Sequence, residues 1–375
     1  MPIPYGRQSV DERDVQAVVE VLRSDRLTQG PAVAAFEEAF AAACDAPYAV
    51  AFANGTAALH AAAFAAGLGP GDELVTSAIT FAASANCAAY VGATPRFADI
   101  EPATWNVSAR TVAAASGPAT KAIVPVHFAG KPAPVAEIRA AVGDGVTIIE
   151  DAAHALGART ADEVVGACRH ADMAIFSFHP VKAITSAEGG MVTTRDPALR
   201  DRLAAFRTHG IVREPGDGHG GWHQEQVLLG FNYRLSDVHA ALGRSQLGRL
   251  DAFVARRNEV AERYRAALAD VGALELPPAA GPGGRHAYHL FAVRCRGGAG
   301  ARRALYDGLH ARGILAQVHY EPVYLHPYYR ERYGYGEGLC PEAEGYAAGC
   351  LSLPCFPDLR ESEQDAVIVA VRELI

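Results

Sequence analysis

A single lysine, Lys182, lies among small, hydroxyl and glycine residues between two apolar runs. Residues 173–176 (Met-Ala-Ile-Phe) precede it and residues 191–194 (Met-Val-Thr-Thr) follow it, and both runs are typical of buried strands. The only acid between residues 177 and 190 is Glu188. An amine held beside a packed sheet is poorly hydrated, which lowers its pKa and favours the neutral form that makes a Schiff base with an aldehyde. The alternative is an ordinary lysine in a loop between two strands.

A second pattern predicts an anion site. The apolar run 48–52 leads directly into Asn54-Gly55-Thr56, where a helical segment begins. A strand, a turn of small residues and a helix N-terminus together direct backbone N–H groups at one bound anion, and a phosphate suits that arrangement. The alternative is that Asn54 only caps the helix.

Two acids end the apolar run 147–149, and the second of them, Asp151, is a candidate for chemistry. A buried acid is costly unless it is paired, and ligands bind at the carboxyl ends of strands in an α/β sheet. The alternative role for Asp151 is a helix cap. Phe81 starts another expected helix, and its ring belongs either to the core or flat against a cofactor ring.

Strands alternate with helices up to about residue 195, which predicts a mostly parallel α/β sheet. We expect the first helix to be capped by Ser9, with Glu12 completing a capping box. We also expect one long helix from about residue 237 to residue 270.

A stretch rich in proline and glycine, residues 277–284, then has the composition of a linker. Beyond it, expected strands at 289–293 and 314–319 flank a helix at 301–312, which indicates a smaller α+β domain. We therefore expect a large domain at residues 1–245, and an interdomain helix plus a small C-terminal domain at residues 246–375.

The bulk composition is that of a globular enzyme. The 375 residues are 50% apolar and 20% charged, and the net charge of −8 disfavours a nucleic-acid partner. Neither a signal core at the start nor a membrane span is expected, so we expect a cytoplasmic protein. Seven cysteines without a Cys-x-x-Cys pair predict reduced, mostly buried thiols, and the fourteen histidines show no spacing typical of a metal site.

Taken together, these motifs resemble the fold-type I, pyridoxal-phosphate-dependent sugar aminotransferases of the DegT/DnrJ/StrS family, over essentially the whole chain. Five segments carry the resemblance in the family's order: 54–56, 150–157, 177–190, 207–210 and 232–234. The resemblance implies the aspartate aminotransferase-like fold, with a mostly parallel-sheet large domain and a smaller α+β domain.

Within that family, the likeness is to enzymes of the pseudaminic acid pathway, which aminate C4 of a UDP-linked 4-keto-6-deoxy-N-acetyl-L-altrosamine sugar. Residues 5–9, 27–30, 179–182 and 313–320 carry it. The chain departs from those enzymes at Ala183, where they typically have a proline. The sequence of the loop at 212–225 also differs from theirs, and loops of this kind set sugar specificity.

The resemblance assigns roles to particular residues. Lys182 would hold pyridoxal phosphate as a Schiff base and move a proton, with L-glutamate as amino donor. Asp151 would pair with the pyridine nitrogen, His154 would lie near the ring and Phe81 would stack on it. The groups that would hold the phosphate are Gly55, Thr56, Ser177 and Asn232, the last from a neighbouring subunit of a homodimer. The residues that would contact the nucleotide-sugar are Tyr5, Arg26, Leu27, Thr28, Asn54, Ser177, Asn232, Gln317, Val318, His319 and Tyr320.

Three alternatives remain beside this interpretation. An aminotransferase on another nucleotide-linked ketone, of UDP-D-gluco, GDP or dTDP type, has the same cofactor motifs. A sugar dehydratase of this superfamily has histidine where this chain has Lys182. A non-catalytic regulatory relative would have lost Lys182 or Asp151, and both are present.

Overall fold

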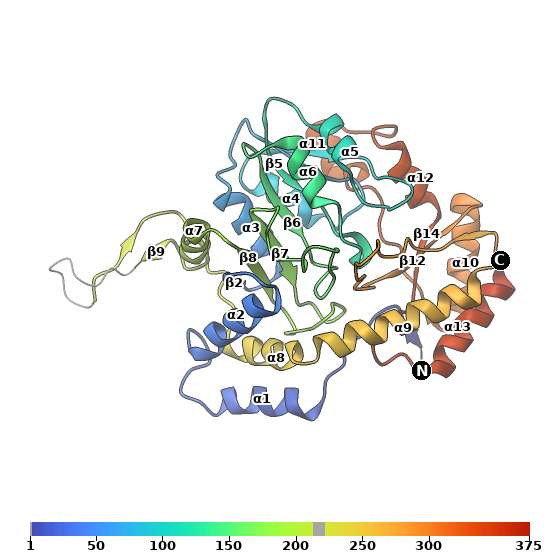
Figure 1. Cartoon of the computed structure of the whole chain (residues 1–375), viewed down its shortest axis with the longest axis horizontal. Coiled ribbons are helices and arrows are strands. Elements are labelled where there is room, and N and C mark those ends of the chain that lie inside the picture. The colour runs from blue at the N-terminus through green and yellow to red at the C-terminus, as the bar shows by residue number, and fades with distance from the viewer. Residues whose placement is uncertain (1, 213–221) are drawn as a thin grey trace.

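The computed structural model describes residues 2–212 and 222–375. Residues 213–221, most of the loop that we expected to set sugar specificity, lie outside the described residues. Two sheets organise the rest, a large one in the first half of the chain and a small one in the second half (Figure 1).

The large sheet has seven strands; β8 runs antiparallel to its neighbours β2 and β7, and the other neighbouring strands are parallel. In spatial order the strands are β2 (Tyr48–Phe52), β8 (Gly190–Thr194), β7 (Met173–Ser177), β6 (Thr147–Asp151), β5 (Thr120–Val124), β3 (Glu73–Ser77) and β4 (Thr94–Ala98). The prediction of a mostly parallel α/β sheet is confirmed. The parallel order brings the carboxyl ends of β6 and β7 to one edge of the sheet.

Helices cover both faces of this sheet, because its strands alternate their buried side chains between the faces. One face packs against α3 (Gly55–Ala65), α4 (Ala83–Tyr90) and α7 (Pro197–Arg207). The other packs against α2 (Pro31–Ala43), α5 (Ala109–Ala115) and α6 (Val135–Val142). In β7, for example, Ile175 faces the first group of helices and Phe176 faces α2.

The second half of the chain is built on a three-stranded antiparallel sheet of β11 (Leu274–Glu275), β12 (Phe291–Cys295) and β14 (Cys350–Leu353). The long helix α9 (Leu250–Leu268) runs from the large sheet to this part (Figure 1). The other elements here are α10 (Gly298–Ala311), β13 (Ile314–Leu315), α11 (Pro327–Tyr333), α12 (Pro341–Gly349) and α13 (Glu361–Leu374). The N-terminal strand β1 (Ile3–Pro4) joins it, pairing in parallel with β13.

Three expectations for this part are corrected. The single helix expected from residue 237 is two helices, since α8 (Asp237–Leu247) ends before Gly248 and α9 begins at Leu250. The expected strand at 289–293 begins only at Phe291, because the N–H of Leu290 donates to Ala129 O at 3.2 Å instead of to a partner strand. The expected strand at 314–319 keeps only its first two residues. The domain boundary expected after residue 245 stays a prediction.

All seven cysteines are buried and unbridged, as the sequence predicted. Burial raises the pKa of Cys87 and Cys350 to about 12, so these thiols are protonated and unreactive near neutral pH. Among the helices of residues 2–212 and 222–375, none is long and apolar enough to cross a membrane.

The first helix, α1 (Glu12–Leu22), begins later than the sequence indicated. Its cap is Asp11, whose side chain accepts hydrogen bonds from the N–H groups of Arg13 and Asp14. Asp14 accepts in return from the N–H of Asp11, which completes the capping box. The expected cap Ser9 instead donates to Asp358 at 3.0 Å, so the capping box predicted for Ser9 and Glu12 is wrong.

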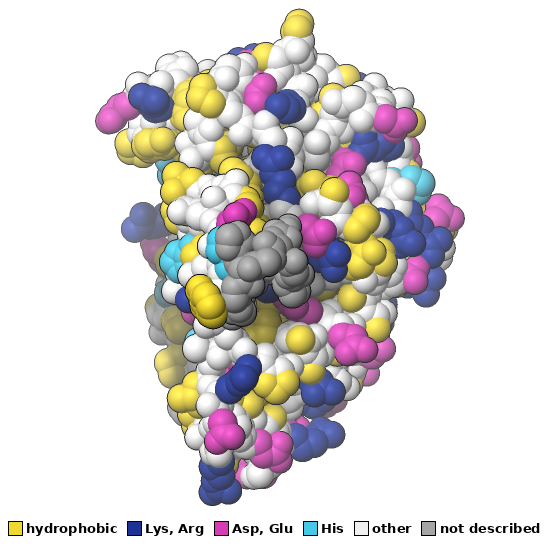
Figure 2. Space-filling model, turned by 90° about the vertical axis from the view of Figure 1, so that its left-hand side faces the viewer, with side chains coloured by type: hydrophobic (Ala, Val, Ile, Leu, Met, Phe, Trp, Pro, Cys, Tyr) yellow, Lys and Arg dark blue, Asp and Glu magenta, His cyan; other side chains and the backbone are white. Residues whose placement is uncertain are grey.

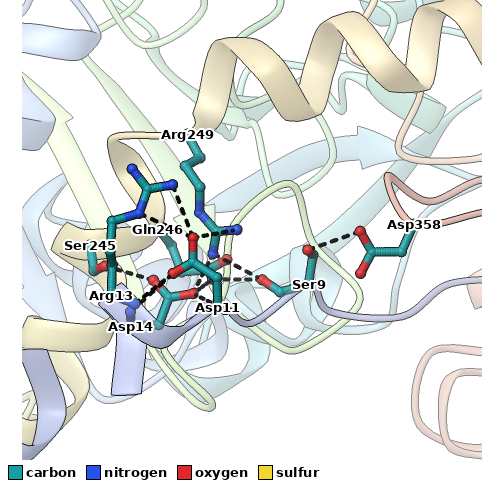
Figure 3. Close-up of polar contacts among 8 residues, drawn as sticks. All are labelled: Ser9, Asp11, Arg13, Asp14, Ser245, Gln246, Arg249 and Asp358. Atoms are coloured by element: carbon teal, nitrogen blue, oxygen red, sulfur yellow. Dashed lines mark hydrogen bonds and ion pairs between the residues drawn. The ribbon is translucent and has the colours of Figure 1, made fainter. Parts of the chain in front are cut away.

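Asp14 also ties α1 to the junction of α8 and α9 (Figure 3). Its side chain is fully buried and accepts from Ser245 Oγ at 2.6 Å and Gln246 Nε2 at 2.5 Å. The guanidinium of Arg249 supplies the counter-charge. Since a buried carboxylate is costly without such partners, this cluster fixes where α1 lies.

We expect Asp14→Ala to lower the free energy of unfolding by about 2–4 kcal/mol, because it strands the buried donors and leaves Arg249 with only Asp11 as acidic partner. Urea unfolding followed by circular dichroism measures this. The control is Arg13→Ala, which removes an exposed ion pair in the same cluster and should leave the midpoint nearly unchanged. Equal effects of the two substitutions would contradict a special role for the buried carboxylate.

Candidate active site

A cavity of about 980 Å³ opens at the carboxyl ends of β6 and β7. The sheet contributes Asp151 and Ser177 to its wall, and the second half of the chain contributes His289, His319 and Tyr320. The cavity therefore lies between the two parts of the chain, where side chains from distant segments converge.

One side of the cavity is the N-terminus of α3. Asn54 Oδ1 accepts from the N–H of Ala57 at 2.8 Å, which leaves the N–H groups of Gly55 and Thr56 at the open end of the helix. A β-carbon on Gly55 would lie 2.9 Å from the β-carbon of Ser177, so only glycine allows Ser177 to come this close. Backbone donors, a hydroxyl and a helix dipole thus surround one point, as a phosphate requires.

Asp151 ends β6 and is 5% exposed. Ser84 Oγ donates to Asp151 Oδ2 at 2.5 Å, and the N–H of Ala153 donates to Oδ1 at 3.1 Å. Ser84 is in turn bonded to Thr80 Oγ1 at 2.7 Å. These donors fix the direction of the carboxylate toward the cavity that it lines.

Ser84 was not among the candidate residues. The signal for it was Thr80 and Ser84, two hydroxyls four residues apart just before and within the start of α4.

Lys182 lies in the loop between β7 and β8, and backbone bonds fold that loop tightly. The N–H of Lys182 donates to His179 O at 2.9 Å, and the N–H of Phe178 donates to Gly189 O at 2.9 Å. A β-carbon on Gly190 would lie 2.4 Å from Asn54 O, so glycine is required where β8 passes the turn at residues 54–56, here called the phosphate turn. Glu188, Gly189 and Gly190 therefore serve the shape of the loop that presents the lysine.

The pKa of the Lys182 amine is lowered, as the sequence predicted. Burial lowers its pKa from 10.5 to about 8, against the opposing charge of Asp151, which favours the ammonium form. The amine is therefore partly neutral near pH 8, which a nucleophilic lysine needs.

Three of the imidazoles in the cavity wall, those of His154, His289 and His319, are neutral at physiological pH. Burial lowers the pKa of His154 and His289 well below the usual value, and lowers that of His319 to about 4. The charge of Lys182 acts in the same direction on all three. Tyr320 Oη lies 3.2 Å from His154 Nε2, and burial raises the pKa of Tyr320, so this phenol stays protonated.

Most of the residues predicted for the site do converge. Those that line the cavity are Tyr5, Asn54, Gly55, Thr56, Phe81, Asp151, His154, Ser177, Lys182, His319 and Tyr320. Phe81 is 60% exposed, so its ring belongs to the mouth of the cavity and not to the core. The role of each residue toward a ligand stays a prediction.

Six predicted residues lie elsewhere within the described chain: Arg26, Leu27, Thr28, Asn232, Gln317 and Val318. Thr28 pairs with Ser236, and the N–H of Asp237 donates to Leu27 O at 3.0 Å. The segments 26–28 and 232–236 therefore form one unit. Tyr233 of this unit lines the cavity of its own chain, whereas Arg26, Leu27, Thr28 and Asn232 do not. Gln317 is bonded through its backbone to Ser352, which directs it to the small sheet.

The sequence interpretation missed other residues of the cavity wall. His289 and Tyr233 both line it, as do His60 and Tyr90 beside the phosphate turn. His289 stands alone in the apolar run Ala287 to Phe291, a pattern that gave no signal of function.

Comparisons with known proteins agree with this geometry. Residues 8–372 match the DegT/DnrJ/EryC1/StrS aminotransferase family. The spore coat polysaccharide biosynthesis protein SpsC of Bacillus subtilis is 39% identical, over 100% of this chain and 97% of its own. Helicobacter pylori PseC, an aminotransferase of pseudaminic acid biosynthesis, is 30% identical with a TM-score of 0.92, over 100% of this chain and 99% of its own.

A Streptococcus pneumoniae protein described as a candidate sugar aminotransferase, solved in its PLP form, is 26% identical with a TM-score of 0.92, over the full length of both chains. The likeness to these structures confirms the predicted fold, an α/β fold of type I. The chain belongs to the DegT/DnrJ/EryC1/StrS aminotransferase family, and its expected cofactor is pyridoxal phosphate.

Proposed function

We propose that the protein transfers the amino group of L-glutamate to C4 of a UDP-linked 4-keto-6-deoxy-N-acetyl-L-altrosamine sugar, as a UDP-4-amino-4,6-dideoxy-N-acetyl-beta-L-altrosamine transaminase of pseudaminic acid biosynthesis in the cytoplasm. One observation carries the chemistry: a single cavity holds a lysine of lowered pKa, an oriented carboxylate and a helix N-terminus. The likeness to PseC supports the choice of sugar. The rival is an aminotransferase on another nucleotide-linked 4-keto-6-deoxy sugar.

The residues of the cavity fit pyridoxal phosphate. Gly55, Thr56 and Ser177 offer donors to its phosphate, and Asp151 offers a carboxylate to its pyridine nitrogen. Phe81 supplies an aromatic face at the mouth, and His154 lies beside Asp151 in the wall. When bound, the cofactor supplies a carbonyl carbon for the amine and an electron sink for the adjoining carbon.

Lys182 has two tasks in this proposal. Its neutral amine would hold the cofactor covalently. Once displaced by the amino group of glutamate, the same Nζ would take the proton from the α-carbon of glutamate and deliver it to the cofactor. A pKa near 8 suits both directions, because neither form of the amine is strongly favoured. Ser84 and the N–H of Ala153 keep the Asp151 carboxylate fixed while protons move at Lys182.

The opposite end of the cavity would receive the sugar. Tyr5, His319 and Tyr320 belong to the cavity wall and would form this part of the site, and the rings of Tyr5 and His319 are 5.0 Å apart. His319 Nδ1 is bonded to Ser352 Oγ at 2.9 Å, so the imidazole is fixed and neutral, able to bond with a sugar hydroxyl or carbonyl.

We also propose a homodimer with shared sites, in which Arg26, Leu27, Thr28 and Asn232 from the unit of segments 26–28 and 232–236 enter the cavity of the second copy. Asp237 fixes this unit by accepting from the N–H groups of Gly30 and Ala32 at 2.8 and 2.9 Å. Apolar side chains lie on the face that carries the hairpin of β9 (Ile211–Val212) and β10 (Glu225–Gln226) (Figure 2), and Leu229, shortly after β10 in the chain, is 78% exposed. A cavity wall with two acids, Asp151 and Glu188, and one lysine needs further donors for an anionic nucleotide.

Covalent attachment of pyridoxal phosphate to the apoprotein should speed up about tenfold per pH unit below pH 8 and level off above it, because only the neutral Lys182 amine reacts. Absorbance measures the rate, and borohydride reduction followed by peptide mass spectrometry identifies the lysine. Nα-acetyl-lysine, measured in parallel, corrects for ionisation of the cofactor itself.

Lys182→Arg keeps a cation but should abolish attachment. A rate that continues to rise up to pH 10 would mean that the amine titrates as an exposed lysine.

The sugar assignment is tested by incubating the holoenzyme with ¹⁵N-L-glutamate and one ketone at a time, with mass spectrometry of the product. We expect the UDP-linked L-altro ketone to gain the label, and D-gluco, GDP- and dTDP-linked ketones to react at least about a hundredfold more slowly, since discrimination requires polar contacts to ring hydroxyls. Labelling of one of those other ketones alone overturns the substrate and favours the rival. A protein that labels none of them lacks the proposed activity.

The shared site is tested with two differently tagged variants, Lys182→Ala and Asn232→Ala, purified as the mixed dimer. If Asn232 acts on the other copy, each mixed dimer has one intact site and should recover about half of the activity of the unmodified dimer. If Asn232 acts within its own chain, the mixed dimer has no intact site and stays as inactive as the parents. Light scattering gives the oligomeric state in the same samples.

A further inference from the structure

His289 is a buried histidine in the wall of the cavity to which the proposed mechanism gives no task. It is 5% exposed, and its Nδ1 is buried without a hydrogen-bond partner among the described residues. An unpaired buried polar atom costs about 1–3 kcal/mol, which an apolar side chain of the same shape would not incur. The position is therefore unfavourable for stability, and it lies in the cavity wall, where a ring can act on the residues that meet the cofactor.

The neighbour of His289 is His154. The two ring centroids are 4.3 Å apart with 34° between the planes, so His289 covers one face of the His154 imidazole. At its edge, His154 Nε2 is bonded to Tyr320 Oη at 3.2 Å. His154 Nδ1 has no partner among the residues that the structure describes. One bond at Nε2 does not fix the plane of the ring, which then depends on packing. The rings of Tyr320 and Phe128 lie 6.1 and 6.3 Å from that of His154, and the ring of His289, at 4.3 Å, lies nearer than either.

The segment that carries His289 is itself held firmly. Arg257 on α9 is 1% exposed and donates through Nη1 to the carbonyls of Tyr288, His289 and Cys355, at 3.2, 3.3 and 2.6 Å. Its Nη2 reaches Val181 O, next to Lys182, at 3.5 Å. The backbone of His289 is thereby joined to the lysine loop across the cavity wall.

We propose that His289 is a positioning residue, which packs against His154 and fixes the plane of that imidazole beside Asp151 and Lys182, where the cofactor binds. The inference rests on the proposed function only in that pyridoxal phosphate occupies this cavity. His289 acts through ring stacking, so an aromatic ring without nitrogen can replace it. Because Arg257 holds the backbone of residues 288 and 289, the His289 ring is attached to a fixed segment.

The test is the dissociation constant of pyridoxal phosphate from the apoprotein, measured by fluorescence quenching, with thermal unfolding of each apoprotein. His289→Ala should raise the constant about tenfold, because His154 no longer holds one orientation, and His289→Phe should return it to within about threefold of the unmodified protein. The absorption band of the bound cofactor should broaden or shift in His289→Ala and not in His289→Phe. Equal losses in both variants would overturn a stacking role.

The matched control is His286→Ala. His286 is also buried, at 2% exposure, and stacks on Tyr288 at 3.9 Å, but it does not line the cavity. We expect it to lower the unfolding temperature as His289→Ala does while leaving the dissociation constant within about twofold. A rise equal to that of His289→Ala would make the effect a general loss of packing and overturn the proposal.

A double-mutant cycle separates action through His154 from a direct effect. In a His154→Ala background, His289→Ala should change the dissociation constant no further, because the ring that it positions is gone. A full tenfold effect in that background would overturn the proposal. The experiment uses no sugar, so a failure of the substrate assignment leaves its outcome unchanged.

Discussion

The opposition of one amine and one carboxylate within a single cavity is the constraint on which the rest of the site depends. Asp151 and Lys182 come from the ends of β6 and β7, which are adjacent and parallel, so the sheet itself brings the two charges together. Burial removes water from the amine and lowers its pKa to about 8, while the carboxylate limits that fall. Neither group alone would give an amine that is stable in the cavity and reactive near neutral pH.

Close backbone contacts also fix the position of the loop that carries Lys182. The β8 backbone at Gly190 passes so close to Asn54 that no β-carbon fits, and Gly55 is equally close to Ser177. These two close contacts bring the loop that carries Lys182 and the N-terminus of α3 to the same edge of the sheet. A phosphate held at α3 and an aldehyde at Lys182 are then separated by a fixed distance, which selects a ligand that carries both groups.

The sequence allowed prediction of those parts of the site that strand order determines. Asp151, Ser177 and Lys182 all follow recognisable apolar strands, so their convergence follows from an α/β sheet alone. The strands in the second half of the chain were less well predicted. His289 and the segment after Leu315 extend along the cavity instead of forming strands, and the periodicity of apolar residues does not indicate such contacts. His289 could not be predicted for the same reason.

The position of segments 26–28 and 232–236 links the proposed assembly of two copies to recognition of the sugar. They share one surface because Thr28 pairs with Ser236 and Asp237 binds the turn at Gly30, and these bonds close within one chain. A unit tied in this way cannot bring Thr28 to the cavity of its own chain while leaving Asn232 behind. Tyr233 of this unit lines the cavity of its own chain, so in the proposed homodimer Thr28 and Asn232 would reach the second copy from a unit that also lines the first, and assembly and sugar recognition would depend on one surface. Sequence reasoning treated the two segments as separate motifs, and only their pairing in the fold joins them.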